Sequence, residues 1–362
     1  MKNTGPADKS CYVYLLKSCD SGPAKSYVGW TVDLEKRLAA HNDGSGAKAT
    51  RGRKWQLVHS EVFKTRSAAM SREYELKHNR RERQILLSQD GKNKGTRIMT
   101  SYTQMMQAFL ASKSGDSYQA DLPETWKQGR TAFGGLTSAL LLAAILNDHD
   151  DLPPLRTVQV NFIGPAVDAL NVSHEILRRG KNNVTVRAEL DSTAGAGTHG
   201  YFTFGVEREL DIAMDYPLKE ITKKPDEIEP YSLGDQAPNF LVNFDRRWVS
   251  GPQFFQQSDD PDMLIWTRMT DPESWDKGLM PLVVLADTPP AAFGALSGVR
   301  ALSSMNWNIN FLTDDFTTED GWWLMRSATR FIRDGYSSQL IQVWNSEGRR
   351  VMDSAQHIAI FQ

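Results

Sequence analysis

The sequence predicts an α+β protein in two parts: a small α/β domain, followed by two antiparallel sheets that each wrap around a long helix. Three observations support this prediction. The balance of charge reverses near residue 98, a polar segment lies at the same point, and a helix followed by several strands occurs twice in the remainder. The two parts are therefore expected to fold as separate units.

The first part is strongly basic. Residues 1–98 contain 20 Lys and Arg against 10 Asp and Glu, whereas the remainder contains 22 against 34, so the total charge of −2 conceals a basic and an acidic half. A basic module of this size favours a polyanionic partner such as nucleic acid, whereas the acidic remainder does not.

The composition is typical of a globular cytoplasmic protein, with 40% hydrophobic residues. The sequence has no run of 18 apolar residues, which argues against a membrane-spanning helix, and the N-terminus lacks the apolar core of a signal peptide. We therefore expect a cytoplasmic protein with no membrane partner, in which Cys11 and Cys19 are reduced thiols.

The basic part begins with a predicted hairpin of strands Cys11–Leu16 and Ser26–Trp30. Asp33 is the expected N-cap of a helix over Leu34–Asn42, and a second helix is expected over Ser67–Leu87. The loop between the helices, residues 44–54, is rich in glycine and basic residues. Such a loop can follow a phosphate backbone closely.

Several separated positions of this segment form one pattern. Tyr12-Val13-Tyr14 and Tyr27-Val28-Gly29 lie on the two strands, Arg37 and His41 share one face of the first helix, and Glu73 lies on the second helix. At these positions residues 11–85 resemble the GIY-YIG nuclease superfamily. Trp30 follows the second triplet, where several such nucleases have a lysine.

The resemblance implies a phosphodiester hydrolase with one divalent metal, Mg²⁺ or Mn²⁺, bound by Glu73. Tyr27 as phenolate would deprotonate a water, and Arg37 would neutralise the charge that develops on the phosphate. Tyr14 and His41 would orient or assist. DNA is then a candidate partner of this domain.

An internal methionine, Met99, marks the junction of the two parts. The preceding residues have almost no apolar side chain to bury and read as a linker, and a new amphipathic pattern begins at Thr103. One hypothesis is that two reading frames became fused and that Met99 was the start of the second. The alternative is that Met99 is an ordinary linker residue.

The acidic part contains the pattern of a helix and strands twice. Phe133-Gly134-Gly135-Leu136 opens a helix that runs to Leu146 and is apolar on nearly every face. A second apolar helix is expected over Met280–Ala286. The predicted strands are Leu155–Phe162, Val172–Leu177, Val184–Leu190 and Gly200–Val206 after the first helix, and Ser303–Phe311, Trp322–Phe331, Ser337–Trp344 and Val351–Ile360 after the second.

A long helix enclosed by a curved antiparallel sheet is the hotdog arrangement, so two copies predict a double hotdog. The predicted boundaries are 1–87 for the basic domain, 88–102 for the linker, 103–208 for the first hotdog, 209–240 for the inter-hotdog linker and 241–362 for the second hotdog.

A set of separated residues links this part to one family. They are Phe133-Gly134-Gly135, Arg178-Arg179-Gly180-Lys181, Asp287, Ser304 within Ser304–Phe311, and Gln356. Together they resemble acyl-CoA thioesterase II-type double-hotdog enzymes, which hydrolyse acyl-CoA to fatty acid and CoA without a cofactor. We expect a homo-oligomer.

The resemblance implies a hydrolytic water held by Asp287, Ser304 and Gln356, with Asp287 either as general base or as the group that orients the water. Backbone N–H groups at a helix start would stabilise the thioester oxyanion, with Gly135 as the candidate, and Gly134 is expected to bind substrate beside it. For Arg178 and Arg179, contacts to CoA phosphates and exposed turn positions are both open. Asp287 also precedes two prolines and could simply end a helix.

Two functions from different classes follow. The first is an acyl-CoA thioesterase fused to a GIY-YIG-type DNA endonuclease-like domain. The alternative is a non-catalytic acyl-CoA-binding hotdog protein with a nucleic-acid-binding N-terminal domain.

Overall fold

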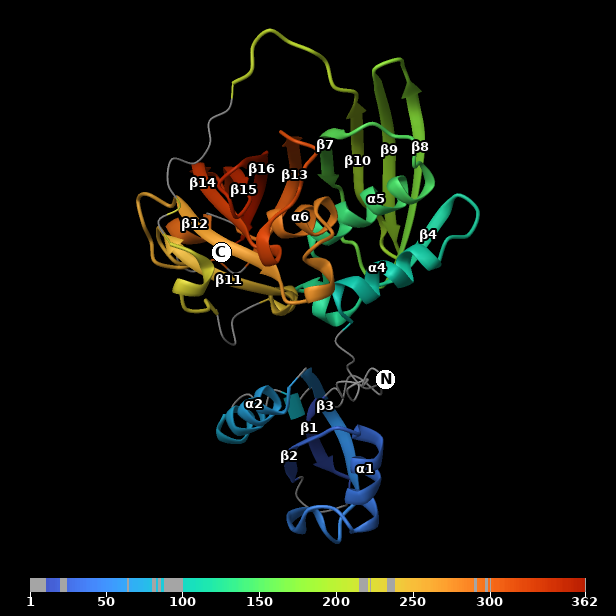
Figure 1. Cartoon of the computed structure of the whole chain (residues 1–362), viewed down its shortest axis with the longest axis vertical. Coiled ribbons are helices and arrows are strands. Elements are labelled where there is room, and N and C mark those ends of the chain that lie inside the picture. Colours follow the sequence, from blue (N-terminus) through green and yellow to red (C-terminus); the bar gives the residue numbers. More distant parts are fainter. Residues whose placement is uncertain are drawn as a thin grey trace, which may run out of the picture. The chain divides into compact units, whose positions relative to one another are not determined.

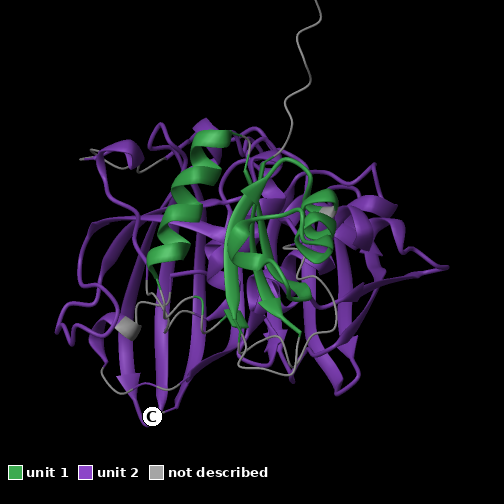
Figure 2. Cartoon of the chain, turned by 90° about the horizontal axis from the view of Figure 1, so that it is seen from below, with its two compact units in different colours: residues 1–99 green, residues 100–362 purple. Residues whose placement is uncertain are grey.

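The computed structural model divides into two compact units, residues 1–99 and 100–362 (Figure 2). It describes residues 11–19, 25–63, 65–79, 83, 86–87, 100–214, 221, 223–232, 238–289, 292–296, 299 and 301–361. Met99 and residues 88–98 of the predicted linker lie outside this set.

The first unit is a three-stranded antiparallel sheet with two helices. Strand β1 (Cys11–Ser18) lies between β2 (Ser26–Thr31) and β3 (Trp55–Phe63), and the helices are α1 (Leu34–Asp43) and α2 (Arg66–His78). The predicted hairpin and first helix are confirmed, whereas β3 was missed. The second predicted helix, Ser67–Leu87, is interrupted: α2 ends at His78, where Asn79 leaves helical geometry and caps it, and Arg83, Leu86 and Leu87 are again helical.

Local chemistry explains where α1 begins and ends. The Asp33 side chain accepts a hydrogen bond from the backbone N–H of Lys36, as an N-cap residue does. Gly44 ends the helix with a φ of 88°, a left-handed conformation that favours glycine. These two residues fix the face of α1 that presents Arg37 and His41 to β1.

The second unit is built on one continuous antiparallel sheet of 11 strands (Figure 1). In spatial order its strands are β11 (Phe244–Ser250), β12 (Met263–Met269), β14 (Trp323–Arg333), β15 (Tyr336–Trp344), β16 (Arg350–Phe361), β13 (Ala301–Phe311), β7 (Leu155–Phe162), β10 (Gly195–Gly205), β9 (Asn183–Ser192), β8 (Ala169–Arg179) and β4 (Ser117–Asp121). The two hotdog sheets join where β13 pairs with β7.

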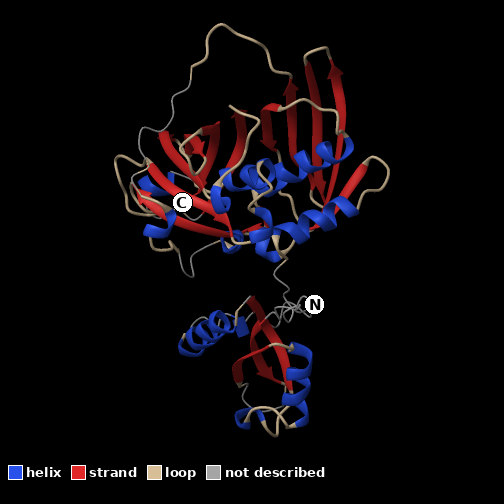
Figure 3. Ribbon diagram, viewed as in Figure 1, coloured by secondary structure: helices blue, strands red, loops and turns tan. Residues whose placement is uncertain are grey.

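Each half of this sheet packs against a central helix, α5 (Gly134–Asp148) or α6 (Leu279–Ala286) (Figure 3). The predicted double hotdog is therefore confirmed, with strands close to the predicted ones. Strands β4, β11 and β12 precede the central helices and were not predicted. An N-terminal helix α4 (Tyr102–Ala111), capped by Ser101, occupies the position of the predicted amphipathic segment.

The helix α5 is buried from Gly135 to Ile145. The helix has two buried hydroxyl groups, on Thr137 and Ser138. Both donate a hydrogen bond to the Gly134 carbonyl oxygen at 2.9 Å. A Cβ added to Gly135 would lie 2.5 Å from the Val284 carbonyl oxygen, so only glycine allows α5 and α6 to approach this closely. This close approach joins the two repeats around one hydrophobic core.

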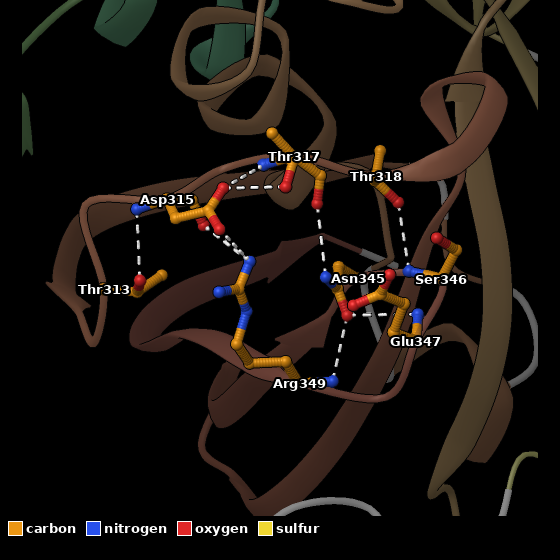
Figure 4. A network of polar contacts seen from close by, with 8 residues as sticks. All are labelled: Thr313, Asp315, Thr317, Thr318, Asn345, Ser346, Glu347 and Arg349. Carbon is orange, nitrogen blue, oxygen red and sulfur yellow. Dashed lines mark hydrogen bonds and ion pairs between the residues drawn. The ribbon is translucent and has the colours of Figure 1, made fainter.

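A polar network joins two loops at one end of the sheet, one between β13 and β14 and one between β15 and β16 (Figure 4). Arg349 donates to the Asp315 carboxylate at 2.7 Å, and the Asn345 amide donates to the Thr317 carbonyl at 3.2 Å. Hydrogen bonds from Thr317 and from Arg349 lower the pKa of Asp315 to about 2. The network therefore ties the turn between β15 and β16 to the connection between β13 and β14.

Four tryptophans predicted as core or interface residues are buried: Trp307, Trp322, Trp323 and Trp344. Within the described residues, no helix has both the length and the apolar character needed to cross a membrane.

Candidate functional sites

Asp287 lies where the two hotdogs meet. It is the C-cap of α6, and its carboxylate accepts a hydrogen bond from Gln356 Nε2 on β16 at 2.5 Å. It also accepts a hydrogen bond from the backbone N–H of Gly135 at the start of α5. One carboxylate is thus held by the C-terminal sheet and by the first turn of the N-terminal helix.

Its surroundings make Asp287 a weaker acid. Burial raises its pKa to about 7, and the hydrogen bonds from Gln356 and Gly135 oppose the rise. The residue as a whole is half-buried. The carboxylate can therefore take up and release a proton near neutral pH, as a general base must.

Gln339 fixes the orientation of the Gln356 amide. These two residues face each other across β15 and β16, and Gln339 Nε2 donates to Gln356 Oε1 at 2.7 Å. This leaves Gln356 Nε2 to donate to Asp287. Sequence reasoning missed Gln339, although its alternation with Ile341 and Val343 on β15 was a signal that it points into the core.

Ser304 lies on β13 opposite Ile358, and Gln356 is two residues from Ile358 on the same strand. Ser304 and Gln356 therefore share one face of the sheet. A β-bulge follows Ser304, and Asn306 accepts a hydrogen bond from the His357 backbone N–H at 3.2 Å. Among the described residues, Ser304 has no hydrogen bond to Asp287 or Gln356.

The predicted Gly134 and Gly135 lie beside Asp287. A Cβ added to Gly134 would lie 2.8 Å from Asp287 Oδ2 and 3.0 Å from the Phe162 ring. The Gly135 N–H is directed at the Asp287 carboxylate, so in this state it serves the carboxylate rather than a thioester oxygen.

The predicted Arg178 and Arg179 lie at the end of β8. Four other strands, β13, β7, β10 and β9, separate β8 from β16, which carries Gln356. Arg179 forms a two-point ion pair with Asp151, with distances of 2.8 and 3.2 Å, and Arg178 is exposed. Nothing in the described contacts joins either arginine to Asp287.

A band of buried polar side chains lies on the same face of the C-terminal sheet as Gln356. Thr329, Gln339 and Gln356 are neighbours across β14, β15 and β16. Several buried oxygens of this face have no hydrogen-bond partner among the described residues; they belong to Thr267, Ser327, Thr329, Ser337, Gln339 and Ser354. A buried polar group without a partner costs about 1–3 kcal/mol, so these oxygens favour contact with water or another polar group.

The first unit brings together most of its predicted site residues. Tyr14 Oη lies 2.9 Å from His41 Nε2 and accepts a hydrogen bond from Arg37 Nε at 3.1 Å. The Tyr27 ring packs on the His41 ring, with centroids 4.9 Å apart. A Cβ added to Gly29 would lie 2.5 Å from Tyr14 Oη, which explains the glycine at the end of the second triplet.

Burial favours the neutral forms of Tyr14 and His41 beside the charged Arg37. Burial raises the pKa of Tyr14, and the hydrogen bond from Arg37 opposes the rise. Burial and the Arg37 charge lower the pKa of His41, whose Nδ1 lies 2.7 Å from Thr50 Oγ1. Where a nuclease lysine was expected, the Arg66 guanidinium lies 5.0 Å from the Trp30 ring.

Glu73 on α2 is near enough to Tyr14 for its charge to raise the pKa of that phenol. The Glu73 carboxylate forms an ion pair with Lys77 Nζ at 2.9 Å. Among the described residues, no group of three metal-ligating side chains occurs. One carboxylate fits Mg²⁺, which keeps several of its waters when bound. Glu73 is therefore a suitable single protein ligand.

The comparisons with known proteins follow the division into two units. Residues 10–85 match the GIY-YIG catalytic domain, residues 122–205 the acyl-CoA thioesterase N-terminal domain, and residues 222–360 the acyl-CoA thioesterase C-terminal domain. A UPF0213 protein of Haloquadratum walsbyi is 49% identical over 81 residues, which are 22% of this chain and 88% of that protein.

The chain joins a GIY-YIG domain of the UPF0213 family to an acyl-CoA thioesterase.

Solved structures agree with the double hotdog of the thioesterase. A conserved protein with a hot dog fold from Alicyclobacillus acidocaldarius superposes with a TM-score of 0.64 at 19% identity, covering 71% of this chain and 98% of that one. An acyl-CoA thioesterase II of Mycobacterium marinum gives 0.55 at 15% identity, with coverages of 71% and 98%. At these identities the likeness is one of fold.

Proposed function

We propose that the thioesterase unit hydrolyses acyl-CoA with Asp287 as general base, and that Gln356 and Ser304 help to hold the attacking water. The observation that carries this proposal is the Asp287 carboxylate, whose pKa is raised to about 7 by burial while Gln356 and Gly135 donate to it. These two donors fix the carboxylate in one orientation. With this pKa, the carboxylate is partly deprotonated near neutral pH and can accept a proton.

The proton follows a closed path in this mechanism. Asp287 accepts a proton from water as the oxygen attacks the thioester carbonyl carbon. The C–S bond then breaks, and the CoA sulfur receives the proton from Asp287. The start of α5 at Gly134 supplies backbone N–H groups and the positive end of a helix dipole, which favour negative charge on the carbonyl oxygen.

The polar band beside Gln356 supports a proposal about the substrate. Its unpartnered oxygens, such as those of Ser337 and Ser354, can bond to waters or to polar groups of an acyl chain. We propose that acyl groups with hydroxyl or carbonyl substituents are hydrolysed faster than plain alkyl chains of equal length. A panel of CoA thioesters matched in length tests this order directly.

The activity itself is tested with Asp287→Ala in the full chain. The wild type should release free thiol from acyl-CoA, and the variant should be slower by about 10²-fold or more, as expected when a positioned general base is lost. Acyl-CoA binding without hydrolysis by the wild type would instead favour the non-catalytic binding protein.

We further propose that the GIY-YIG unit cleaves DNA. The supporting observation is the cluster of Tyr14, Arg37 and His41, with Tyr27 packed on His41 and Glu73 nearby. Because burial raises the pKa of Tyr14, Tyr27 is the better candidate for the base, and Arg37 is placed to neutralise phosphate charge. A Mg²⁺ or Mn²⁺ ion held by Glu73 would supply Lewis-acid activation of the phosphate.

A further inference from the structure

The thioesterase unit has a cavity that takes no part in the mechanism above. Its volume is about 460 Å³, and it lies beside the edge strand β11. Neither Asp287 nor Gln356 lines it. Most of its wall is apolar or aromatic, and the residues used in the argument below are Tyr231, Val242, Phe244, Arg246, Arg268 and Trp275.

Arg246 in this wall is a buried cation. It has 4% of its surface exposed, and its Nε and Nη1 atoms are buried with no hydrogen-bond partner among the described residues. Its neighbour is the Tyr231 ring, whose centre lies 5.5 Å from the guanidinium carbon. Burial lowers the pKa of Arg246 to about 10, so the guanidinium remains charged at neutral pH.

The two neighbouring arginines, Arg247 on β11 and Arg268 on β12, are balanced by an acid. Both contact the Asp245 carboxylate, at 3.1 and 3.4 Å, and Arg268 also lies 4.2 Å from the centre of the Trp275 ring. Arg246 has no such carboxylate among the described residues. Asp245 therefore supplies counter-charge to Arg247 and Arg268 and not to Arg246.

An unpaired buried guanidinium destabilises a folded protein unless another group offsets its charge. Carboxylates and phosphates do so best, because the guanidinium fork can donate two parallel hydrogen bonds to them. The charged lining residues are Asp245, Arg246 and Arg268, so the wall carries one net positive charge. That balance favours a monoanion over a multiply charged ligand.

We propose that this cavity binds an organic monocarboxylate with an apolar body, its carboxylate on Arg246 and its body against Phe244, Val242 and Trp275. The volume lies in the range of small-molecule sites. The acid released by thioester hydrolysis belongs to this chemical class, but the cavity is separate from Asp287 and the proposal does not depend on that activity.

The test is calorimetric titration and thermal unfolding of the full chain with octanoate, and with inorganic phosphate and octylamine as probes of charge. Octanoate should bind saturably and raise the unfolding temperature, and octylamine should not. Arg246→Gln should weaken octanoate binding by about tenfold or more, because charge-assisted hydrogen bonds are lost. Arg333→Gln, which changes an exposed arginine at the end of β14, is the matched control.

A second variant keeps the proposal testable if Arg246→Gln folds poorly. Val242→Trp fills the cavity from its partly exposed edge, and it should also abolish octanoate binding while Arg246 remains. Asp287→Asn should leave octanoate binding in the cavity intact, which separates this cavity from the hydrolytic site.

Three results would overturn the proposal. They are equal octanoate affinity in Arg246→Gln, binding of phosphate as strong as that of octanoate, and loss of octanoate binding in Asp287→Asn.

Discussion

The Asp287 carboxylate and the Gln356 amide are 69 residues apart in sequence and share a hydrogen bond of 2.5 Å. Asp287 ends the central helix of the second hotdog, where the negative end of the helix dipole disfavours its charge. Gln356 favours the charge from the neighbouring sheet. The protonation of Asp287 is therefore set by a balance between burial and a small number of donors.

The pH dependence of hydrolysis should report this balance. Because the base must be deprotonated and its pKa is raised to about 7, kcat/KM should rise as the pH passes through about 7 and then level off. Gln356→Met removes a bond that favours the carboxylate, so the rising limb should move to higher pH and the maximum should fall. Rates of thiol release measured between pH 5 and 9 give both quantities.

Gln342→Met is the control for this series, because Gln342 lies on the same sheet opposite Arg326 and Asp353 rather than beside Asp287. Its pH profile should match that of the wild type. A profile of Gln356→Met that is shifted no more than this control would remove the Asp287 to Gln356 bond from the mechanism.

The same pKa predicts how Asp287 affects stability. The folded-state pKa of about 7 lies above the unfolded value of about 3.8, so deprotonation favours the unfolded state once the pH exceeds about 4. The resulting penalty grows up to about pH 7 and is constant above it. Asp287→Asn should therefore be more stable than the wild type at pH 8 and close to it at pH 4.

Urea unfolding of the two proteins at both pH values measures the difference. A stability gain of equal size at pH 4 and pH 8 would show that the effect of the substitution is unrelated to the ionisation of Asp287.

Gly134→Ala should impair hydrolysis because the new methyl group would lie 2.8 Å from Asp287 Oδ2 and 3.0 Å from Phe162. The carboxylate or the ring must move, and a displacement of this kind at a catalytic group costs up to about 10²-fold in rate. Gly180→Ala is the matched control, since its Cβ would meet the nearest atom at an ordinary 3.4 Å. Equal kcat values for the two variants would show that Asp287 tolerates the displacement.

The sequence predicted the repeated helix-and-strand order, because alternation and apolar runs are local properties of the chain. The set of Asp287, Gln356 and the two glycines came instead from the resemblance to acyl-CoA thioesterase II-type enzymes. Sequence reasoning missed Gln339, whose role depends on its pairing with Gln356 in the neighbouring strand. It also missed β3, β11 and β12. Register and edge pairing come from tertiary contacts, which no local pattern contains.

The two glycines Gly134 and Gly135 also show that a local sequence pattern does not contain tertiary contacts. The pattern Phe133-Gly134-Gly135 indicated exposed N–H groups at a helix start, but the reasons for glycine are the Val284 carbonyl and the Asp287 side chain, both distant in sequence. Similarly, no sequence pattern distinguishes Arg246, and its lack of a hydrogen-bond partner among the described residues is visible only in the folded unit.

DNA cleavage by the GIY-YIG unit should require Glu73. With Mg²⁺ or Mn²⁺ present, branched or single-stranded DNA should be cut by the wild type and not by Glu73→Gln, which keeps the shape of the side chain and loses its charge. Binding should persist in this variant, because it depends on the basic loop at residues 48–54, and should weaken as salt rises. Gel assays of cleavage and fluorescence titrations of binding separate the two.

Glu75→Gln is the control for Glu73→Gln, since Glu75 lies on the same helix with a more exposed side chain and contacts Arg72. Its cleavage should match that of the wild type. Salt-sensitive binding by the wild type without any cleavage would leave the unit as a nucleic-acid-binding domain.

Residues 99–362, expressed from Met99, should fold and hydrolyse acyl-CoA at the rate of the full chain. The thioesterase unit contains its own capped first helix, α4, whose Ser101 and Gln104 exchange hydrogen bonds as a capping box. Among the described residues, every member of the double-hotdog core belongs to this unit, and every member of the GIY-YIG core belongs to the other unit. We therefore expect both units to keep their stability when they are separated. Circular dichroism, thermal unfolding and thiol release measured on the fragment and the full chain make the comparison, and an insoluble or inactive fragment would argue against two fused, independent proteins.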